Sequence, residues 1–156
     1  MPTTTLQARI ANPALVVPGA IDALQSLHKA IQQTRLDAKL LELINLRASQ
    51  INGCGVCALQ HPKIARNLGE TDDRLRALVA WRDAPFFTDA ERAALALTEA
   101  ATHLTDTPDP VPDNIWDQAT HHYDEPQLAG LVMAIASINA WNRLNVATRQ
   151  VAGAEW

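Results

Sequence analysis

Apolar side chains recur along most of the chain at the three- and four-residue spacing of an amphipathic helix. Residues 19–33 carry one such apolar face, and residues 37–51 carry another behind a candidate cap at Asp37. The sequence contains no alternating β-branched run and no hairpin turn between two such runs. The pattern therefore predicts an all-α protein of about seven helices that forms a single domain over residues 1–156.

Capping signals place the helices in the middle of the chain. The Asn-Gly pair at 52–53 ends the second helix, and a third helix is expected from Cys54 to Gly69. Residues 73–82 form the next expected helix, with three apolar side chains pointing inward: Leu75, Leu78 and Val79. Thr88 and Glu91 match a capping box that opens a helix to about residue 103.

The last third of the chain combines a proline-rich connector with the most apolar segment. Residues 107–113 are expected to lie on the surface, and Pro112 suits the first turn of a helix to His122. Asp124 is the expected cap of the last and longest helix. Because residues 128–138 are apolar on most sides, this helix is expected in the core or in an oligomer interface.

Composition and charge narrow the classes of partner. The net charge is −4 without a basic patch, which argues against nucleic-acid binding. The N-terminal residues lack the features of a secretory signal, and no stretch approaches the ~20 apolar residues that span a bilayer. A cytoplasmic protein without membrane contact is therefore expected. Thiols stay reduced there, so a CxxC pair is more typical of redox or metal chemistry than of a structural disulfide.

The segment NGCGVCALQH at 52–61 holds the only two cysteines of the chain. Cys54, Cys57 and His61 are spaced by three and four residues, which puts all three on one helix face. Free N–H groups and the helix dipole favour a thiolate at Cys54, and His61 can take a proton from Cys57. Gly53 and Gly55 leave little bulk near Cys54, which predicts an accessible pair suited to reversible oxidation.

A carboxylate is expected to belong to the same group. Glu42 lies between two leucines, where a charge is costly unless it is paired or lines a site. If the helices on either side of the Asn-Gly break fold against each other, Glu42 approaches His61 or the cysteines. The alternative is a solvated position or a salt bridge with Lys39 or Arg47, which are close in sequence.

The spacing Glu42-x11-Cys54-x2-Cys57-x3-His61 resembles that of the AhpD-like alkylhydroperoxidases of the carboxymuconolactone decarboxylase superfamily. The core of the resemblance spans residues 36–69, and a second matching stretch is INAWNRLN at 138–145. The resemblance implies an all-helical fold and a homo-oligomer, whether dimer, trimer or hexamer. It also implies thiol-dependent reduction of small hydroperoxides, with no cofactor or metal ion. A dithiol, thioredoxin-like or lipoyl reductant would then restore the protein.

The resemblance also implies a role for each residue. Cys57 is oxidised to a sulfenic acid, Cys54 supplies a proton and then closes the Cys54–Cys57 disulfide, and His61 and Glu42 form the proton relay. The helix dipole alone favours Cys54 as the thiol of lower pKa. The family order is preferred because His61 stands four residues after Cys57 and offers it a base.

Two positions depart from the family pattern. Val56 stands where the best-understood peroxidases carry a histidine, which removes one relay member and predicts weaker turnover or another preferred oxidant. Pro62 follows His61 and is expected to bend or restart the helix. The physiological substrate is then a hydroperoxide, another disulfide or an electrophile.

Other interpretations compete for these residues. A zinc site would use both cysteines, His61 and Glu42, but the second ligand pair typical of structural zinc is missing. A muconolactone-type decarboxylase is disfavoured because decarboxylating relatives generally lack the CxxC pair. A non-enzymatic regulator whose oligomer rearranges on oxidation would use the same two thiols.

The remaining polar and aromatic residues are given structural interpretations. The histidines without a partner pattern are expected on the surface or at helix ends: His28, His103, His121 and His122. Trp116 and Trp141 are expected as core or interface anchors. Four polar residues of the last helix are assigned to a buried hydrogen-bond network or a subunit contact rather than to catalysis: Asn139, Asn142, Arg143 and Asn145.

Overall fold

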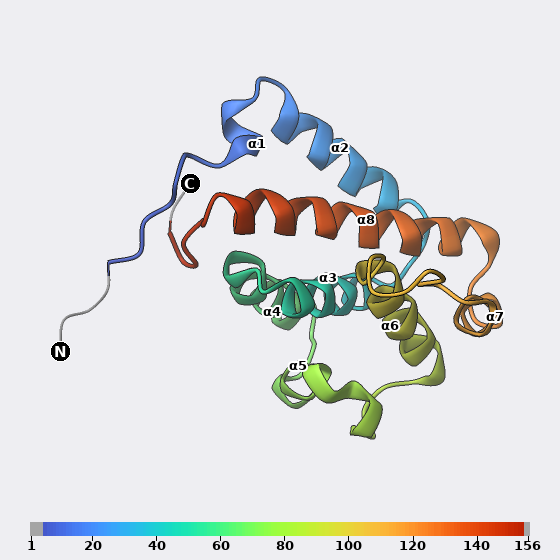
Figure 1. Ribbon diagram of the computed structural model, residues 1–156. Coiled ribbons are helices and arrows are strands. Elements are labelled where there is room, and N and C mark those ends of the chain that lie inside the picture. The colour runs from blue at the N-terminus through green and yellow to red at the C-terminus, as the bar shows by residue number, and fades with distance from the viewer. Residues whose placement is uncertain (1–4, 155–156) are drawn as a thin grey trace.

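The computed structural model describes residues 5–154, which form eight α-helices and one 3-10 helix and contain no β-strand (Figure 1). The all-α class expected from the sequence is confirmed. The helices in chain order are α1 (Pro13–Val16), α2 (Ala20–Gln32), α3 (Ala38–Asn52), α4 (Gly55–Asn67), α5 (Asp72–Ala77), η1 (Leu78–Asp83), α6 (Asp89–Thr102), α7 (Asp113–Thr120) and α8 (Glu125–Ala147).

Helix α8 is the central element, because α2, α3 and α6 all pack against it (Figure 1). Its 23 residues start at a capping box formed by Asp124 and Gln127, as expected for the last helix. Gly130 allows the turn between α2 and α3 to approach, since an added Cβ would lie 2.8 Å from the Cβ of Thr34. Val132 and Met133 remain exposed, so the apolar middle of α8 is only partly covered by the chain.

Helices α3 and α4 form the pair that carries the candidate site. Asp37 caps α3 by accepting from the N–H groups of Lys39 and Leu40, as expected. Gly53 ends α3 in the left-handed conformation with φ of 66°, and α4 starts directly after Cys54. Helix α4 continues through Pro62 to residue 67, so it does not end or restart at the proline.

Two segments differ from the sequence-based expectation. Residues 73–82 are not one helix, because the backbone leaves helical geometry at Ala80, with φ of −125° and ψ of 40°. The inward position expected for Val79 is therefore wrong, and its side chain is 60 % exposed. The short helix α1 was not expected; Asn12 caps it and Pro13 occupies its first position.

The N-terminal segment packs beside the end of α8. The N–H of Arg9 donates to the carbonyl of Thr148 at 2.8 Å, and Gln150 Nε2 donates to the carbonyl of Ile10 at 2.9 Å. The two ends of the described chain therefore lie side by side (Figure 1). Within residues 5–154, every helix is too short or too polar to cross a membrane.

Candidate active site

The two cysteines meet at the start of α4 as free thiols. Their Sγ atoms lie 2.7 Å apart, and the N–H of Cys57 donates to Cys54 Sγ at 3.3 Å. Cys54 thus takes the capping position that serine, threonine or aspartate commonly fills. The expected open access to Cys54 is wrong, because its side chain is 1 % exposed and Ala152 of the C-terminal segment packs against Gly55.

The close contact between the two sulfurs shifts the pKa values of the two thiols in opposite directions. The hydrogen bond with Cys57 lowers the pKa of Cys54 to about 6, and this effect outweighs burial, which raises the pKa. The same hydrogen bond raises the pKa of Cys57, and burial and the charge of Cys54 add to that rise. The lower pKa therefore falls on Cys54 and the higher on Cys57. The helix-dipole argument favoured the same cysteine.

Asn145 on α8 reaches both sulfurs, and the neighbouring Asn142 also lowers the pKa of both thiols. Asn145 Nδ2 lies 3.3 Å from Cys57 Sγ and 3.7 Å from Cys54 Sγ. Its Oδ1 accepts from Asn12 Nδ2 at 2.9 Å. Sequence reasoning had placed Asn145 only in a structural network and had not considered Asn12. The available signal was the three-residue spacing of the asparagines at 139, 142 and 145, which puts them on one helix face.

The buried network expected on α8 is present and anchors the turn before the cysteines. Asn52 Nδ2 donates to the Oδ1 atoms of Asn139 and Asn142, at 3.0 and 2.9 Å. Asn142 Nδ2 donates in turn to Ser49 Oγ at 3.0 Å. Arg143 joins the network by donating to Asn139 Oδ1. These bonds hold the end of α3 against α8 and so determine where Cys54 and Cys57 stand.

Glu42 and His61 form the second half of the site. His61 Nδ1 lies 2.7 Å from Glu42 Oε2, and Asn45 Nδ2 lies 3.4 Å from the other carboxylate oxygen. Because Nδ1 is engaged by the carboxylate, Nε2 is the ring nitrogen left to exchange a proton with a molecule in the cavity. Of the two competing cations, Arg47 binds Glu99 instead, at 2.8 Å. Glu42 is 6 % exposed, which fits a carboxylate held by specific partners.

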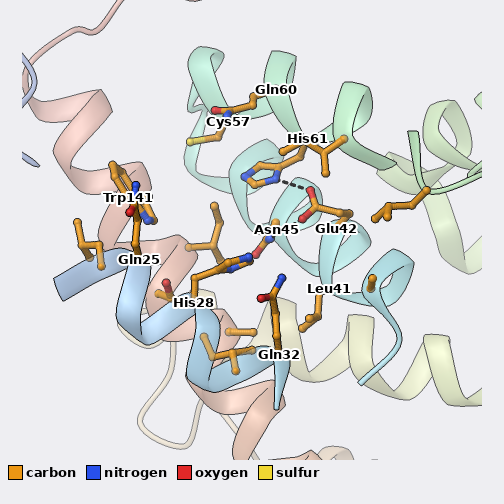
Figure 2. A pocket seen from close by; sticks show the side chains of 18 of the residues that line it. Gln25, His28, Gln32, Leu41, Glu42, Asn45, Cys57, Gln60, His61 and Trp141 are labelled. Carbon is orange, nitrogen blue, oxygen red and sulfur yellow. Dashed lines mark hydrogen bonds and ion pairs between the residues drawn. The ribbon is translucent and has the colours of Figure 1, made fainter. Parts of the chain in front are cut away.

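A cavity of about 490 Å³ joins the two halves of the site. Figure 2 shows Cys57 and His61 of α4 and Glu42 of α3 on one wall, with His28 of α2 and Trp141 of α8 facing them. Cys54 lines a different hollow of about 210 Å³ near Arg149. Within the described chain, no hydrogen bond joins His61 to either sulfur, so a molecule in the cavity is needed to connect them.

Two residues have a wider role than the sequence indicated. His28 is exposed, as expected, but it also lines the cavity. Trp141 packs against the cluster around the cysteines and lines the cavity too, so it is more than a core or interface anchor. Val56 is buried in the same cluster. Across residues 5–154, no three histidine, cysteine or acidic side chains are arranged to hold a metal ion.

Comparisons with known proteins agree with this architecture. The uncharacterised protein YdfG of Bacillus subtilis is 38 % identical over 85 % of this chain and 88 % of its own length. A crystal structure from Agrobacterium tumefaciens, of a protein of unknown function described as an AhpD candidate in antioxidant defence, is 33 % identical. It superposes with a TM-score of 0.87 over 96 % of this chain and 100 % of its own.

The same fold also occurs in an enzyme. The debrominase Bmp8 superposes with a TM-score of 0.74 over 88 % of this chain and 73 % of its own, at 24 % identity. The family model of the carboxymuconolactone decarboxylase family matches residues 18–100, which include Glu42, both cysteines and His61. The chain therefore belongs to the carboxymuconolactone decarboxylase family, as an AhpD-like member.

Proposed function

We propose that the protein is a thiol-dependent peroxidase in which the Cys54–Cys57 pair reduces a hydroperoxide. One observation carries the proposal: Cys57 lies 2.7 Å from a second thiol and lines the same cavity as the Glu42–His61 pair. Nucleophile, resolving thiol and proton carrier are thus available to one bound molecule.

In the first step, Cys57 attacks the peroxide. Its proton passes to the Cys54 thiolate, and Cys57 Sγ forms a bond to the terminal peroxide oxygen while the O–O bond breaks. Cys57 becomes a sulfenic acid and an alkoxide leaves. Cys54 returns the proton to the alkoxide, which departs as an alcohol. Cys57 has this role because it faces the cavity, whereas Cys54 faces the smaller hollow.

In the second step, the dithiol closes. The Cys54 thiolate attacks Cys57 Sγ, the S–O bond breaks, and the departing hydroxide becomes water with a proton that His61 has first taken from solvent at Nε2. His61 thereby returns to its starting state, and Glu42 holds its ring in place at Nδ1 throughout. The pair loses two electrons, which the peroxide has gained. A short CxxC disulfide constrains little of the chain, which suits repeated opening.

A dithiol, thioredoxin-like or lipoyl reductant completes the cycle by thiol–disulfide exchange. Cys57 is the sulfur that such a reductant meets through the cavity, since Cys54 lines the smaller hollow instead. We place the protein in the cytoplasm, where reductants of this kind act, and treat residues 1–156 as one AhpD-like unit. The exposed Val132 and Met133 on α8 support an assembly of two, three or six identical subunits.

The first experiment mixes reduced protein with an alkyl hydroperoxide and follows peroxide loss by stopped flow. Cys57→Ser should abolish the fast reaction, because the attacking sulfur is gone. Cys54→Ser should consume one equivalent and stop at a sulfenic acid that dimedone traps at Cys57. The unsubstituted protein should instead lose two hydrogen atoms and gain the Cys54–Cys57 disulfide, as seen by mass spectrometry.

Protein whose two thiols are alkylated beforehand is the control for peroxide loss that does not involve sulfur. If Cys57→Ser consumes peroxide as fast as the unsubstituted protein, Cys57 is not the nucleophile. If Cys54→Ser still turns over repeatedly with a dithiol, Cys54 is not the resolving thiol.

A further inference from the structure

A continuous chain of hydrogen bonds runs from the N-terminal segment to the two sulfurs. The N–H of Ala14 donates to Asn12 Oδ1 at 3.0 Å, and Asn12 Nδ2 donates to Asn145 Oδ1 at 2.9 Å. Asn145 Nδ2 then lies within 3.3 Å of Cys57 Sγ and 3.7 Å of Cys54 Sγ. The side chains of Asn12, Asn145 and both cysteines are buried, and Asn145 lines both the cavity and the smaller hollow.

The hydrogen bond between Ala14 and Asn12 determines which atom donates and which accepts in the hydrogen bonds that follow. A backbone N–H can only donate, so the atom of Asn12 that faces Ala14 must be its oxygen. The Asn12 amide therefore points Nδ2 at Asn145, and Asn145 must accept this hydrogen bond through Oδ1. Asn145 is left with Nδ2 toward the sulfurs, and the alternative amide orientation would break two buried hydrogen bonds at once.

We propose that Asn145 is the hydrogen-bond donor that stabilises the thiolate of the dithiol, and that Asn12 is the positioning residue that holds Asn145 in the donating orientation. The inference rests on the proposed function in that it takes the two cysteines as the reacting groups. Asn12 and Asn145 are 133 residues apart, and both lie outside the 18–100 segment that the family model matches.

Few titratable or charged groups compete for this role. In the cavity the titratable groups other than Cys57 are His61 on α4, Glu42 on α3 and His28 on α2, and in the smaller hollow the charged group is Arg149 after α8. His61 is bound to Glu42, and no hydrogen bond joins either of them to a sulfur among the residues described. The neutral donor of Asn145 therefore contacts the sulfurs more directly than any of these groups. A hydrogen bond to the charged form of a thiol favours that form.

The test measures the pH midpoint of thiolate formation, from thiolate absorbance in the ultraviolet and from the rate of alkylation by iodoacetamide. Asn145→Leu removes the donor without adding charge and should raise the midpoint by about one pH unit, which is about a tenfold loss of thiolate on the acidic side. Asn145→Gln, which keeps an amide, should recover part of the shift.

Asn12→Asp tests the positioning role without a contact to sulfur. The carboxylate can still accept from the N–H of Ala14, but it can no longer donate to Asn145. The Asn145 amide must then turn its Nδ2 toward residue 12 and its Oδ1 toward the thiolate, and the midpoint should rise. Gln150→Glu is the control for the added charge, because Gln150 lines the hollow beside Cys54 and its side-chain hydrogen bonds go to Ile10 and Thr148, not to a sulfur.

Unchanged midpoints in Asn145→Leu and Asn12→Asp would overturn the inference, as would an equal rise in Gln150→Glu. The unsubstituted protein offers a second measurement that does not depend on variants folding. The side-chain amide resonances of Asn145 should shift with the same midpoint as the thiolate absorbance, and a flat profile contradicts the proposal.

These measurements need no peroxide, so the two proposals fail separately. If the variants raise the pH midpoint of thiolate formation but the unsubstituted protein does not turn over peroxide, the proposed function is overturned and the role of Asn145 and Asn12 stands. Unchanged midpoints in an active peroxidase overturn the role of Asn145 and Asn12 alone.

Discussion

At the residue scale, charge and access lie on different sulfurs. The pKa of Cys54 is lowered to about 6, yet Cys54 does not line the larger cavity. Cys57 lines that cavity, and its pKa is raised. In the proposed reaction, proton transfer across the 2.7 Å contact moves the negative charge to the sulfur that lines the larger cavity.

Glu42 provides the residue-scale prediction for the proton relay. Glu42→Gln keeps the shape and a hydrogen bond to His61 but removes the charge that holds Nδ1 as the proton-bearing atom. His61 can then present the wrong nitrogen to the cavity. We expect peroxide reduction to fall by about a hundredfold. Stopped-flow rates with an alkyl hydroperoxide measure the change.

Glu99→Gln is the control for this prediction. Glu99 is also a largely buried carboxylate, but it pairs with Arg47 and Arg82 and does not line the cavity. Its substitution should lower the melting temperature and leave the rate per folded molecule unchanged. Equal losses of rate in both variants would show that Glu42 acts through stability and not through His61.

At the element scale, the connection between α3 and α4 decides where the sulfurs stand. The two glycines beside Cys54 adopt different backbone conformations. Gly53 adopts φ of 66°, which is strained for any residue with a Cβ, and its surroundings are open. Gly55 has ordinary helical geometry, and an added Cβ would meet Ala152 at 3.6 Å, which is normal contact.

This difference predicts opposite outcomes for the same substitution. Gly53→Ala should lower the free energy of unfolding by about 1 kcal/mol, because the left-handed backbone is disfavoured for alanine. Gly55→Ala should cause no loss, because alanine favours the helix more than glycine does. Urea unfolding of the reduced variants measures both. A Gly55→Ala variant as unstable as Gly53→Ala would mean that packing and not backbone conformation controls this connection.

The elements with explicit caps were predictable from sequence, and the site was predictable only in part. Asp37, Thr88 and Asp124 predict helix starts, because each capping side chain bonds to backbone N–H groups two or three residues further along the chain. The grouping of Glu42, Cys54, Cys57 and His61 could also be predicted from their spacing, since these residues belong to two consecutive helices and the turn between them.

The features of the fold and the site that could not be predicted depend on contacts between residues far apart in the sequence, which local patterns do not reveal. The break at Ala80 follows no turn signal, so residues 73–82 read as one helix. The approach of Asn12 to Asn145 joins residues 133 apart, and nothing near either residue indicates the other. Trp141 looked like a core residue because a cavity lined by four helices exists only after they pack.

At the scale of the whole molecule, the thiol pair links folding to pH. The ordinary pKa of both thiols is 9.0, and folding lowers that of Cys54 to about 6 while raising that of Cys57. Between pH 6 and 9 the unfolded chain binds one proton more than the folded chain, so stability rises with pH. Above pH 9 the unfolded chain loses the proton that Cys57 retains in the folded state, so stability falls.

The reduced protein should therefore gain stability relative to a Cys54→Ser, Cys57→Ser double variant as the pH rises from 6 to 9, and lose it above 9. Other titrating groups are shared by both proteins and cancel in the difference. Chemical unfolding at a series of pH values gives the comparison. A difference that does not change with pH would contradict the separated titration of the two thiols.

The contact between Asn12 and Asn145 beside the dithiol has a consequence for synthesis. A ribosome completes the α4 segment long before it adds Asn145, and the partner of Asn145 at position 12 was made earlier still. A nascent chain that stops short of α8 carries both thiols without the side-chain amide of Asn145. Its sulfurs should therefore have ordinary reactivity until α8 has been made.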